Sequence, residues 1–322
     1  MVSVMGKRGL FLVWLCLVSI LPGMAQTEKL IDYVNPFVGT DGYGNVYPGA
    51  QIPFGGIQMS PDTDSKYYDA ASGYKYNHST LLGFSLTHLS GTGIPDLGDF
   101  LFISGTGEMK LDPGTREEPE KGYRSRYSHE KEWASPNYYA VELSDYGVKA
   151  EMTSGVRSGM FRFTYPQSDK AFIMIDMNHT LWQSCEWANL RMENDSTITG
   201  YKLVKGWGPE RHIYFTATFS KKLTGLRFMQ NKKPVIYNTS RFRSSYEAWG
   251  KNLMACISFD TKAGEEVIVK TAISSVSTNG AKNNMAELAG LTFDDLKAKG
   301  EALWEKELGK YTPVSYTHLR AH

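Results

Sequence analysis

The sequence predicts a mainly β protein, a large antiparallel β-sandwich followed by a short helical linker. Two observations carry this prediction. Short segments rich in β-branched and aromatic residues recur between turn signals, and the sequence changes to helix-forming residues after Asn279. We expect the sandwich domain over residues 26–278 and the helical linker over residues 279–313.

The N-terminus has the three regions of a cleavable signal peptide in the right order. Lys7 and Arg8 are basic, residues 10–21 are apolar, and Gly23 and Ala25 supply small residues at the cleavage point. The apolar run is shorter than the ~20 residues that a membrane span needs. We therefore expect residues 1–25 to be removed, a periplasmic or extracellular location, and no membrane span.

A series of segments with strand composition follows. They are residues 138–145, 148–154, 160–166, 171–177, 213–220, 253–260 and 267–275. Val, Ile, Phe, Tyr and Thr are frequent in them, and Asp-Tyr-Gly at 145–147 is a hairpin turn signal. Short strands at regular spacing predict antiparallel sheets packed as a sandwich.

The helical linker has a start signal and one apolar stripe. Thr292 followed by Asp295 predicts a capping box at the start of a helix. The stripe is expected to contain Phe293, Leu296, Leu303 and Trp304. The last residues, VSYTHLRAH (314–322), break this pattern and match a translated transposon-type sequencing adapter. We expect them to be an adapter-derived artefact, with a natural tail as the alternative, and the gene to continue beyond Pro313.

Charge and cysteine content restrict partners and cofactors. The formal net charge is only +1 at pH 7, so the chain lacks the basic surface that nucleic acid requires, and no nucleic-acid partner is expected. Cys185 and Cys256 remain after cleavage, and their spacing fits no metal motif. A disulfide between them and two buried free thiols are both open.

Generic enzyme motifs assign neither a catalytic residue nor a metal ligand. Residues 88–99, HLSGTGIPDLGD, combine the side-chain types of a nucleophilic triad with three glycines. The preceding GFSLT lacks the second glycine of a nucleophile elbow. Asp62, Asp64 and Asp69 suggest a calcium loop, but a lysine stands where a third oxygen ligand is needed.

Four long segments carry a more specific signal. In order, they are YVNPFVGTDGYGNVYPGAQIPFGGIQMSPDT (33–63), SGYKYNHSTLLGFSLTHLSGTGIPDLGD (72–99), ASPNYYAVELSDYGVKAEMT (134–153) and GWGPERHIYFTATFSK (206–221). Together they resemble the N-terminal part of glycoside hydrolase family 92, the bacterial calcium-dependent exo-α-mannosidases. The resemblance runs from about Leu30 to Tyr311.

The resemblance implies a fold and an activity. In that family a helical linker joins the β-sandwich to an (α/α)6 catalytic barrel, which would be missing here. The barrel carries most calcium ligands and both catalytic carboxylates of an inverting hydrolysis, roughly 6.5–9.5 Å apart. We therefore expect an N-terminal fragment of a secreted exo-α-mannosidase, with calcium as cofactor and no catalytic residue in this chain. Substrates would be terminal α-mannosides, such as α-1,2-linked mannose of N-glycans or mannan.

The resemblance also implies which residues contact sugar. Tyr68 and Asp69 align with a Trp-Asp pair of the family, where an aromatic ring stacks on a pyranose and a carboxylate binds its hydroxyls. Gly49 would let backbone approach the sugar, and His88 belongs to the same pocket wall. The chain departs from the pattern at Tyr68 and at Lys75, where histidine is usual, which leaves linkage preference open. The alternative is that Gly49 serves a turn and His88 is a satisfied buried histidine.

Further residues of the wall have structural alternatives. Asp96 and Asp99 are expected to hold loop backbone, and three tryptophans are expected in the core or at a domain interface, namely Trp182, Trp187 and Trp207. Two function classes stay open. One is the exo-α-mannosidase, of which this chain alone would be inactive; the other is a non-catalytic carbohydrate-binding or structural β-sandwich. Barrel sequence downstream in the gene would distinguish them.

Overall fold

The computed structural model describes residues 29–66, 68–236 and 247–311. The predicted signal peptide (1–25) and the predicted artefact (314–322) lie outside the described residues. Within them, no helix is long and apolar enough to cross a membrane.

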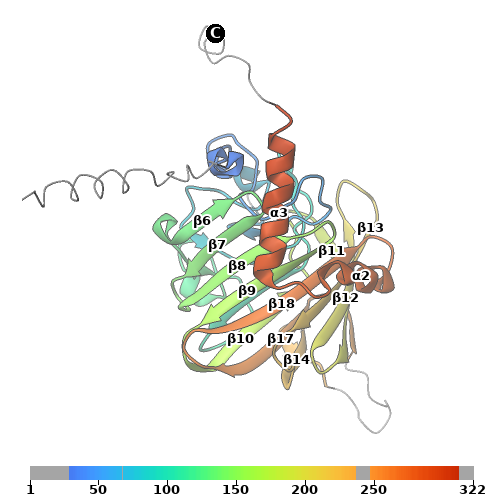
Figure 1. Ribbon diagram of the computed structural model, residues 1–322. Coiled ribbons are helices and arrows are strands. Elements are labelled where there is room, and N and C mark those ends of the chain that lie inside the picture. Colours follow the sequence, from blue (N-terminus) through green and yellow to red (C-terminus); the bar gives the residue numbers. More distant parts are fainter. Residues whose placement is uncertain (1–28, 67, 237–246, 312–322) are drawn as a thin grey trace, which may run out of the picture.

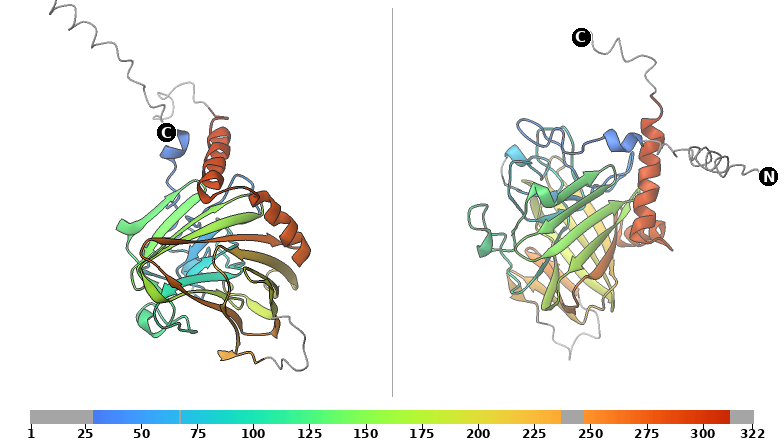
Figure 2. Two further views of the ribbon diagram at one scale, coloured as in Figure 1. Left: turned by 60° about the horizontal axis from the view of Figure 1, so that its bottom comes forward. Right: turned by 60° about the vertical axis from the view of Figure 1, so that its left-hand side comes forward.

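Two antiparallel sheets pack face to face (Figures 1 and 2). The smaller sheet contains, in spatial order, β1 (Ser60–Asp62), β3 (Gly83–Ser85), β4 (Leu101–Thr106), β10 (Ser168–Asp176), β17 (Leu253–Thr261), β14 (Gly225–Gln230) and β15 (Lys233–Pro234). The larger contains β16 (Glu247–Gly250), β11 (Ser184–Asn194), β12 (Thr197–Lys205), β13 (Arg211–Phe219), β18 (Glu265–Ser274), β9 (Ser158–Tyr165), β8 (Val148–Ser154), β7 (Tyr138–Leu143) and β6 (Glu132–Ser135). A short pair, β2 (Thr80–Leu81) and β5 (Ser125–Arg126), stands apart. The predicted antiparallel sandwich is confirmed.

The core between the sheets is built from alternating inward side chains. Phe161 and Phe163 of β9 stack at a centroid distance of 5.5 Å, and Phe102 of β4 packs on Phe161 at 5.0 Å. These rings are buried with residues from nearly every long strand. Cys185 is half-buried and Cys256 is buried, and both are free thiols, so the disulfide alternative does not apply.

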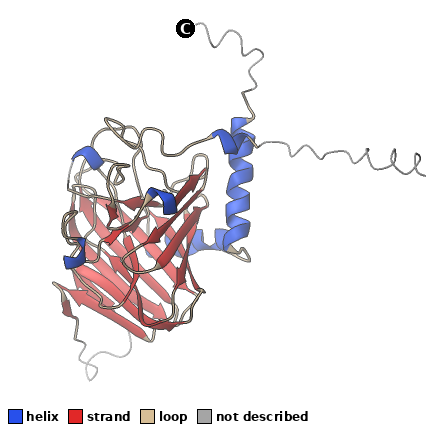
Figure 3. Cartoon of the chain, turned by 90° about the vertical axis from the view of Figure 1, so that its left-hand side faces the viewer, coloured by secondary structure: helices blue, strands red, loops and turns tan. Residues whose placement is uncertain are grey.

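Two α-helices and a 3-10 turn, α2 (Thr278–Asn284), η5 (Met285–Leu288) and α3 (Phe293–Leu308), lie along the outer face of the larger sheet (Figures 2 and 3). The predicted capping box at Thr292 and Asp295 is present. α3 approaches the sheet at Gly300, where a Cβ would lie 1.7 Å from Asn137 Nδ2. The predicted apolar stripe is correct at Phe293 and Leu296, which are buried, and at Trp304, which is half-buried and donates from Nε1 to Gln51 O at 2.6 Å. It is wrong at Leu303, which is 41% exposed.

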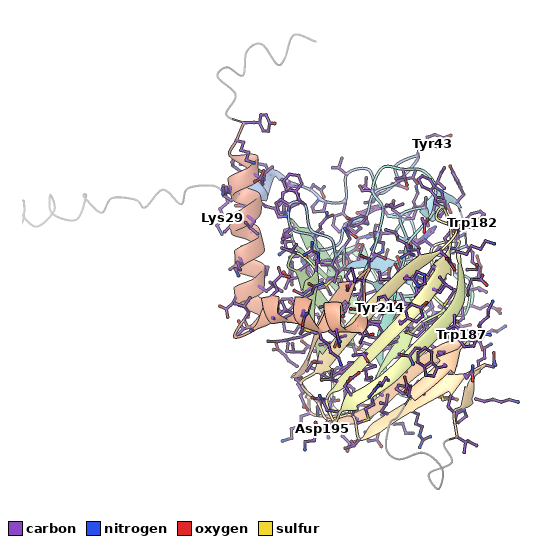
Figure 4. All side chains as sticks on the ribbon, turned by 90° about the vertical axis from the view of Figure 1, so that its right-hand side faces the viewer. Lys29, Tyr43, Trp182, Trp187, Asp195 and Tyr214 are labelled. Carbon is purple, nitrogen blue, oxygen red and sulfur yellow. The ribbon has the colours of Figure 1, made fainter. Side chains whose placement is uncertain are left out.

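Long connections gather at one end of the sandwich and form what we call the loop face, residues 34–59, 63–66, 68–79, 87–99, 177–183 and 206–210. Backbone hydrogen bonds join them, including Gly91 N–H to Asn45 O at 2.5 Å and Leu181 N–H to Leu97 O at 2.9 Å. Figure 4 shows Tyr43 and Trp182 at this end and Asp195 at the other. Short 3-10 turns near this end or on the flanks are η1 (Leu30–Tyr33), η2 (Tyr68–Ala70), η3 (Pro119–Lys121) and η4 (His129–Lys131).

Candidate functional site

The carboxylate of Asp62, at the end of β1, lies under the loop face and binds two histidines of its loops. His88 Nε2 lies 2.8 Å from Oδ1 and His179 Nε2 lies 2.7 Å from Oδ2, and all three side chains are buried. Burial alone would raise the pKa of Asp62, but the charge of His88 and the hydrogen bonds from His179 and His88 hold this pKa well below its ordinary value. Asp62 is therefore an ionised anchor and is unsuited to protonating a leaving group.

His88 does not form a nucleophilic triad with its neighbours. Ser85 Oγ lies 3.1 Å from Nε2, the same ring nitrogen that contacts Asp62. A triad needs the hydroxyl and the carboxylate on opposite nitrogens. The other nitrogen, Nδ1, lies 2.8 Å from the carbonyl oxygen of Gln58. With its side chain 0% exposed, His88 lies under the loop face, and its direct contact with sugar stays a prediction.

A second buried carboxylate, Asp99, holds two cations. Lys202 Nζ lies 3.0 Å from Oδ1, Arg211 Nη1 donates to Oδ2 at 2.6 Å, and Thr87 Oγ1 donates to Oδ2 at 2.7 Å. Burial would raise the pKa of Asp99, but Lys202 and Arg211 keep it well below its ordinary value. Lys202 also donates to the carbonyl oxygen of His179 at 2.6 Å. The clusters around Asp62 and Asp99 are thus connected, and we call them together the ionic support.

Asp96 fixes loop backbone, which is the role expected for it. Its Oδ1 accepts from the N–H of Leu97 at 2.6 Å, and its Oδ2 accepts from the N–H of Trp207 at 3.1 Å. Asp99, by contrast, binds mainly cationic side chains. Neither carboxylate is free to act as a general acid or base in this arrangement.

Gly49 has a packing reason to be glycine. A Cβ there would lie 2.1 Å from the carbonyl oxygen of Met59 and 2.4 Å from Cβ of Ser60. Any side chain would therefore push this loop off β1. Close approach of a sugar to Gly49 stays a prediction, because packing alone accounts for the residue.

Lys75, which the sequence analysis singled out, is buried. Its Nζ donates to the carbonyl oxygens of Gly42 and Gly44 at 2.7 and 3.1 Å. The lysine thus holds the loop around Tyr43, which in turn bonds the tip of the 87–99 loop through Asn45 and Gly91. Lys75 therefore acts on the position of these loops.

Tyr68 and Asp69 reach the surface at the start of η2. Tyr68 is 58% exposed, and its ring meets Trp182 edge to face with centroids 6.3 Å apart. Asp69 Oδ2 lies 3.8 Å from His78 Nε2. A hollow of about 450 Å³ beside the two rings is lined by Ser65, Lys66, Asn178, Thr180, Trp182 and Gln183. We call the rings of Tyr68 and Trp182 the aromatic pair.

Sequence analysis did not place Trp182 among the candidate sugar-contacting residues, although its ring lies against Tyr68. Its φ of 68° is left-handed, which costs a bulky residue roughly 1–3 kcal/mol. The backbone is held there by its N–H, which donates to Ser65 O at 3.0 Å. The core alternative is wrong for all three tryptophans, since Trp182, Trp187 and Trp207 are 54%, 44% and 61% exposed, and the domain-interface alternative stays a prediction. The available signal was a large aromatic residue inside a polar loop, HTLWQS.

Calcium requires several oxygen ligands, 6–8 in most protein sites. Among the described residues, no three Asp, Glu, His or Cys side chains come together as a possible metal site. The two buried carboxylates of the loop face bind histidine, lysine and arginine instead. The described part of the chain therefore does not fit a calcium centre.

Residues 33–274 match the glycosyl hydrolase family 92 N-terminal domain. A family GH92 α-mannosidase from Bacteroides thetaiotaomicron is 88% identical and superimposes with a TM-score of 0.87, covering 89% of this chain. The same mannosidase has been solved in complex with mannoimidazole. The chain spans 39% of the length of that enzyme.

More distant relatives have lower sequence identity to this chain. A family GH92 inverting mannosidase from B. thetaiotaomicron VPI-5482 is 24% identical with a TM-score of 0.74, covering 88% of this chain and 37% of that one, and it shows the fold alone. An uncharacterised secreted glycosidase from Arthroderma benhamiae is 30% identical over 148 residues, which are 45% of this chain and 19% of that protein.

Proposed function

Because the chain belongs to glycosyl hydrolase family 92 and carries its N-terminal domain, we propose that it forms one wall of the substrate pocket of an exported exo-α-mannosidase. The observation that supports this most is the 88% identity to a solved α-mannosidase of the family over 89% of this chain. At this identity, the loops that shape a pocket are expected to be retained along with the sandwich.

The exposed residues of the loop face would bind and orient a terminal α-mannose. Tyr68 and Trp182 offer ring faces and edges on which the C–H side of a pyranose can pack. Asp69 can accept hydrogen bonds from vicinal hydroxyls. Asp62, His88 and His179 are positioning residues, because they lie under the loops and fix their backbones.

The bond-breaking groups would lie in the part of such an enzyme that this chain does not span. Inverting hydrolysis needs a general acid on the leaving oxygen and a general base on the attacking water. The buried carboxylates described above are already ion-paired, so neither fits these roles. Calcium would be held by the same absent part and would bind substrate hydroxyls there. This wall would contribute sugar orientation and exclusion of water.

A domain chimera tests the proposal. The corresponding N-terminal domain of the 88% identical mannosidase is replaced by residues 29–311 of this chain, and mannose release is measured on α-1,2-, α-1,3-, α-1,4- and α-1,6-linked mannobiosides, with and without a calcium chelator. We expect chelator-sensitive release by the chimera and none by the chain alone.

Two variants of the chimera test the wall. Tyr68→Ala and Asp69→Ala should each lower kcat/KM at least roughly tenfold, since each removes a contact to the sugar. Trp133→Ala is the matched control, because Trp133 is a 48% exposed aromatic on β6, outside the loop face. If the chain alone releases mannose as fast as the chimera, the catalytic pair lies within it. If both variants keep full activity, Tyr68 and Asp69 do not contact substrate, and a purely structural sandwich becomes the better account.

A further inference from the structure

A second hollow, which we call the arginine hollow, adjoins the first. It has a volume of about 190 Å³ and is lined by residues 64–66, residues 113–117, Leu82 and Arg124. Ser65 and Lys66 line both hollows. A ligand seated on the aromatic pair can therefore extend into the arginine hollow without leaving the surface.

Arg124 has an unused hydrogen-bonding edge. The residue is only 5% exposed, and its Nη1 donates to Thr63 O at 2.5 Å and to Thr80 Oγ1 at 3.2 Å. Its buried Nε–H has no acceptor in the described part of the protein. Nε and Nη2 form the side of a guanidinium that binds an oxyanion with two parallel hydrogen bonds. Leaving a buried charged donor without an acceptor is costly.

The buried carboxylate of Asp64, beside Arg124, already has hydrogen-bond and ion-pair partners. Oδ1 of Asp64 accepts from the backbone N–H groups of Ser65 and Lys66 at 2.7 and 3.0 Å, and Oδ2 lies 3.4 Å from Arg116 Nε. One buried carboxylate thus faces two arginines, Lys66 adds a third cation at the surface, and Glu117 is the second carboxylate of the lining. The burial of Arg124 lowers its pKa, as expected for a guanidinium that is incompletely compensated.

The opposite side of the hollow is rigid. Gly114 has a φ of +68°, and a Cβ on Gly122 would lie 2.1 Å from the backbone nitrogen of Gly114. These two glycines pack the 112–114 turn directly against residue 122. The hollow is therefore fixed before any ligand arrives, which lowers the entropic cost of binding.

We propose that the arginine hollow is an oxyanion site, which binds a phosphate, sulfate or carboxylate group through the free edge of Arg124, with Lys66 and Arg116 beside it. The anion is either a substituent of a glycan that lies on the aromatic pair or a free ion. The oxyanion site itself does not depend on mannosidase activity.

Calorimetric titration of the full chain with inorganic phosphate, at constant ionic strength set by chloride, tests the site. We expect saturable binding that Arg124→Gln weakens at least roughly tenfold, because it removes a charge-assisted bidentate contact. Lys66→Ala should weaken it a few-fold. Arg126→Gln is the control, since Arg126 is a nearby arginine already paired with Glu120 and Asp145 at the surface.

Each outcome decides the proposal. Absence of phosphate binding, or binding unchanged by Arg124→Gln, overturns it. If Arg124→Gln does not fold, the exposed Lys66→Ala variant decides, and unchanged affinity there overturns the site. A titration with mannose 6-phosphate then identifies the source: tighter binding than inorganic phosphate assigns the anion to a glycan substituent, and equal binding assigns it to a free ion.

Discussion

Phe161 and Asp99 are both fully buried, yet they are stabilised by different interactions. Phe161 lies between the sheets among other aromatic rings, with Phe102 at 5.0 Å and Phe163 at 5.5 Å. Asp99 lies under the loop face, against Lys202 and Arg211. Apolar burial is non-directional and tolerates repacking, whereas a buried charge requires its partners in place. The sandwich core thus provides stability, and the ionic support fixes the positions of the loops.

The largest expected effect breaks the ionic support. Asp99→Asn keeps the side-chain shape but leaves Lys202 buried without its counter-charge, and we expect a loss of about 3–5 kcal/mol in the free energy of unfolding. Urea denaturation of the full chain measures it. A loss below about 1 kcal/mol would mean that the network adds nothing beyond packing.

A milder change in the core provides the comparison. Phe161→Leu should cost about 1–3 kcal/mol, from lost apolar area and a partly relaxed cavity. Since no titratable group is involved, this cost should be the same at pH 5.5 and pH 7.5. A strong dependence on pH would show that the core and the ionic support are coupled.

A smaller effect concerns pH and is confined to the loop face. Burial, followed by the charge of Arg116, lowers the pKa of His78 from its ordinary 6.5. The unfolded chain therefore binds a proton that the folded chain does not, so this contribution to stability is present above pH 6.5 and falls as the pH drops from 6.5 toward the lowered pKa. His78→Gln should flatten this part of the stability curve between pH 7 and pH 5. A curve that is equally steep in both proteins would assign the slope to other groups.

The smallest effect lies at the surface. Asp145 pairs with Arg126 at 2.9 Å with both side chains partly exposed. Solvent screens such pairs, so Asp145→Asn should change stability by no more than about 1 kcal/mol. A loss as large as that of Asp99→Asn would contradict the distinction between buried and exposed charge.

The sequence predicted the strands better than the contacts. The seven predicted segments correspond to β7, β8, β9, β10, β13, β17 and β18, whereas β4, β11, β12 and β14 are among the strands that were missed. β11 is irregular in register between Cys185 and Trp187 and again between Met192 and Asn194, which breaks the period of two. Its outward residues are also exposed tryptophan and charged groups, so apolar content is low.

The candidate site was predictable only through family resemblance, and only for residues close together in sequence. Tyr68 and Asp69 were proposed because they adjoin a recognisable segment, and their contact with sugar stays a prediction. The pairing of Asp62 with His179 spans 117 positions, and no local spacing reports it. Likewise, the left-handed backbone of Trp182 is imposed by its bond to Ser65 in another loop. Such contacts result from tertiary structure, which a one-dimensional pattern does not encode.

The carboxylate of Glu305 on α3 accepts from the backbone N–H groups of Leu30 and Ile31 at 2.8 and 3.1 Å. The first and last described elements of the domain, η1 and α3, are therefore fastened to each other. Under mechanical load applied between them, these two hydrogen bonds would carry the force before those of the sheets do. A short peptide could also join the two elements directly. The domain is therefore suited to circular permutation, with new ends opened on the side of the sandwich remote from the loop face.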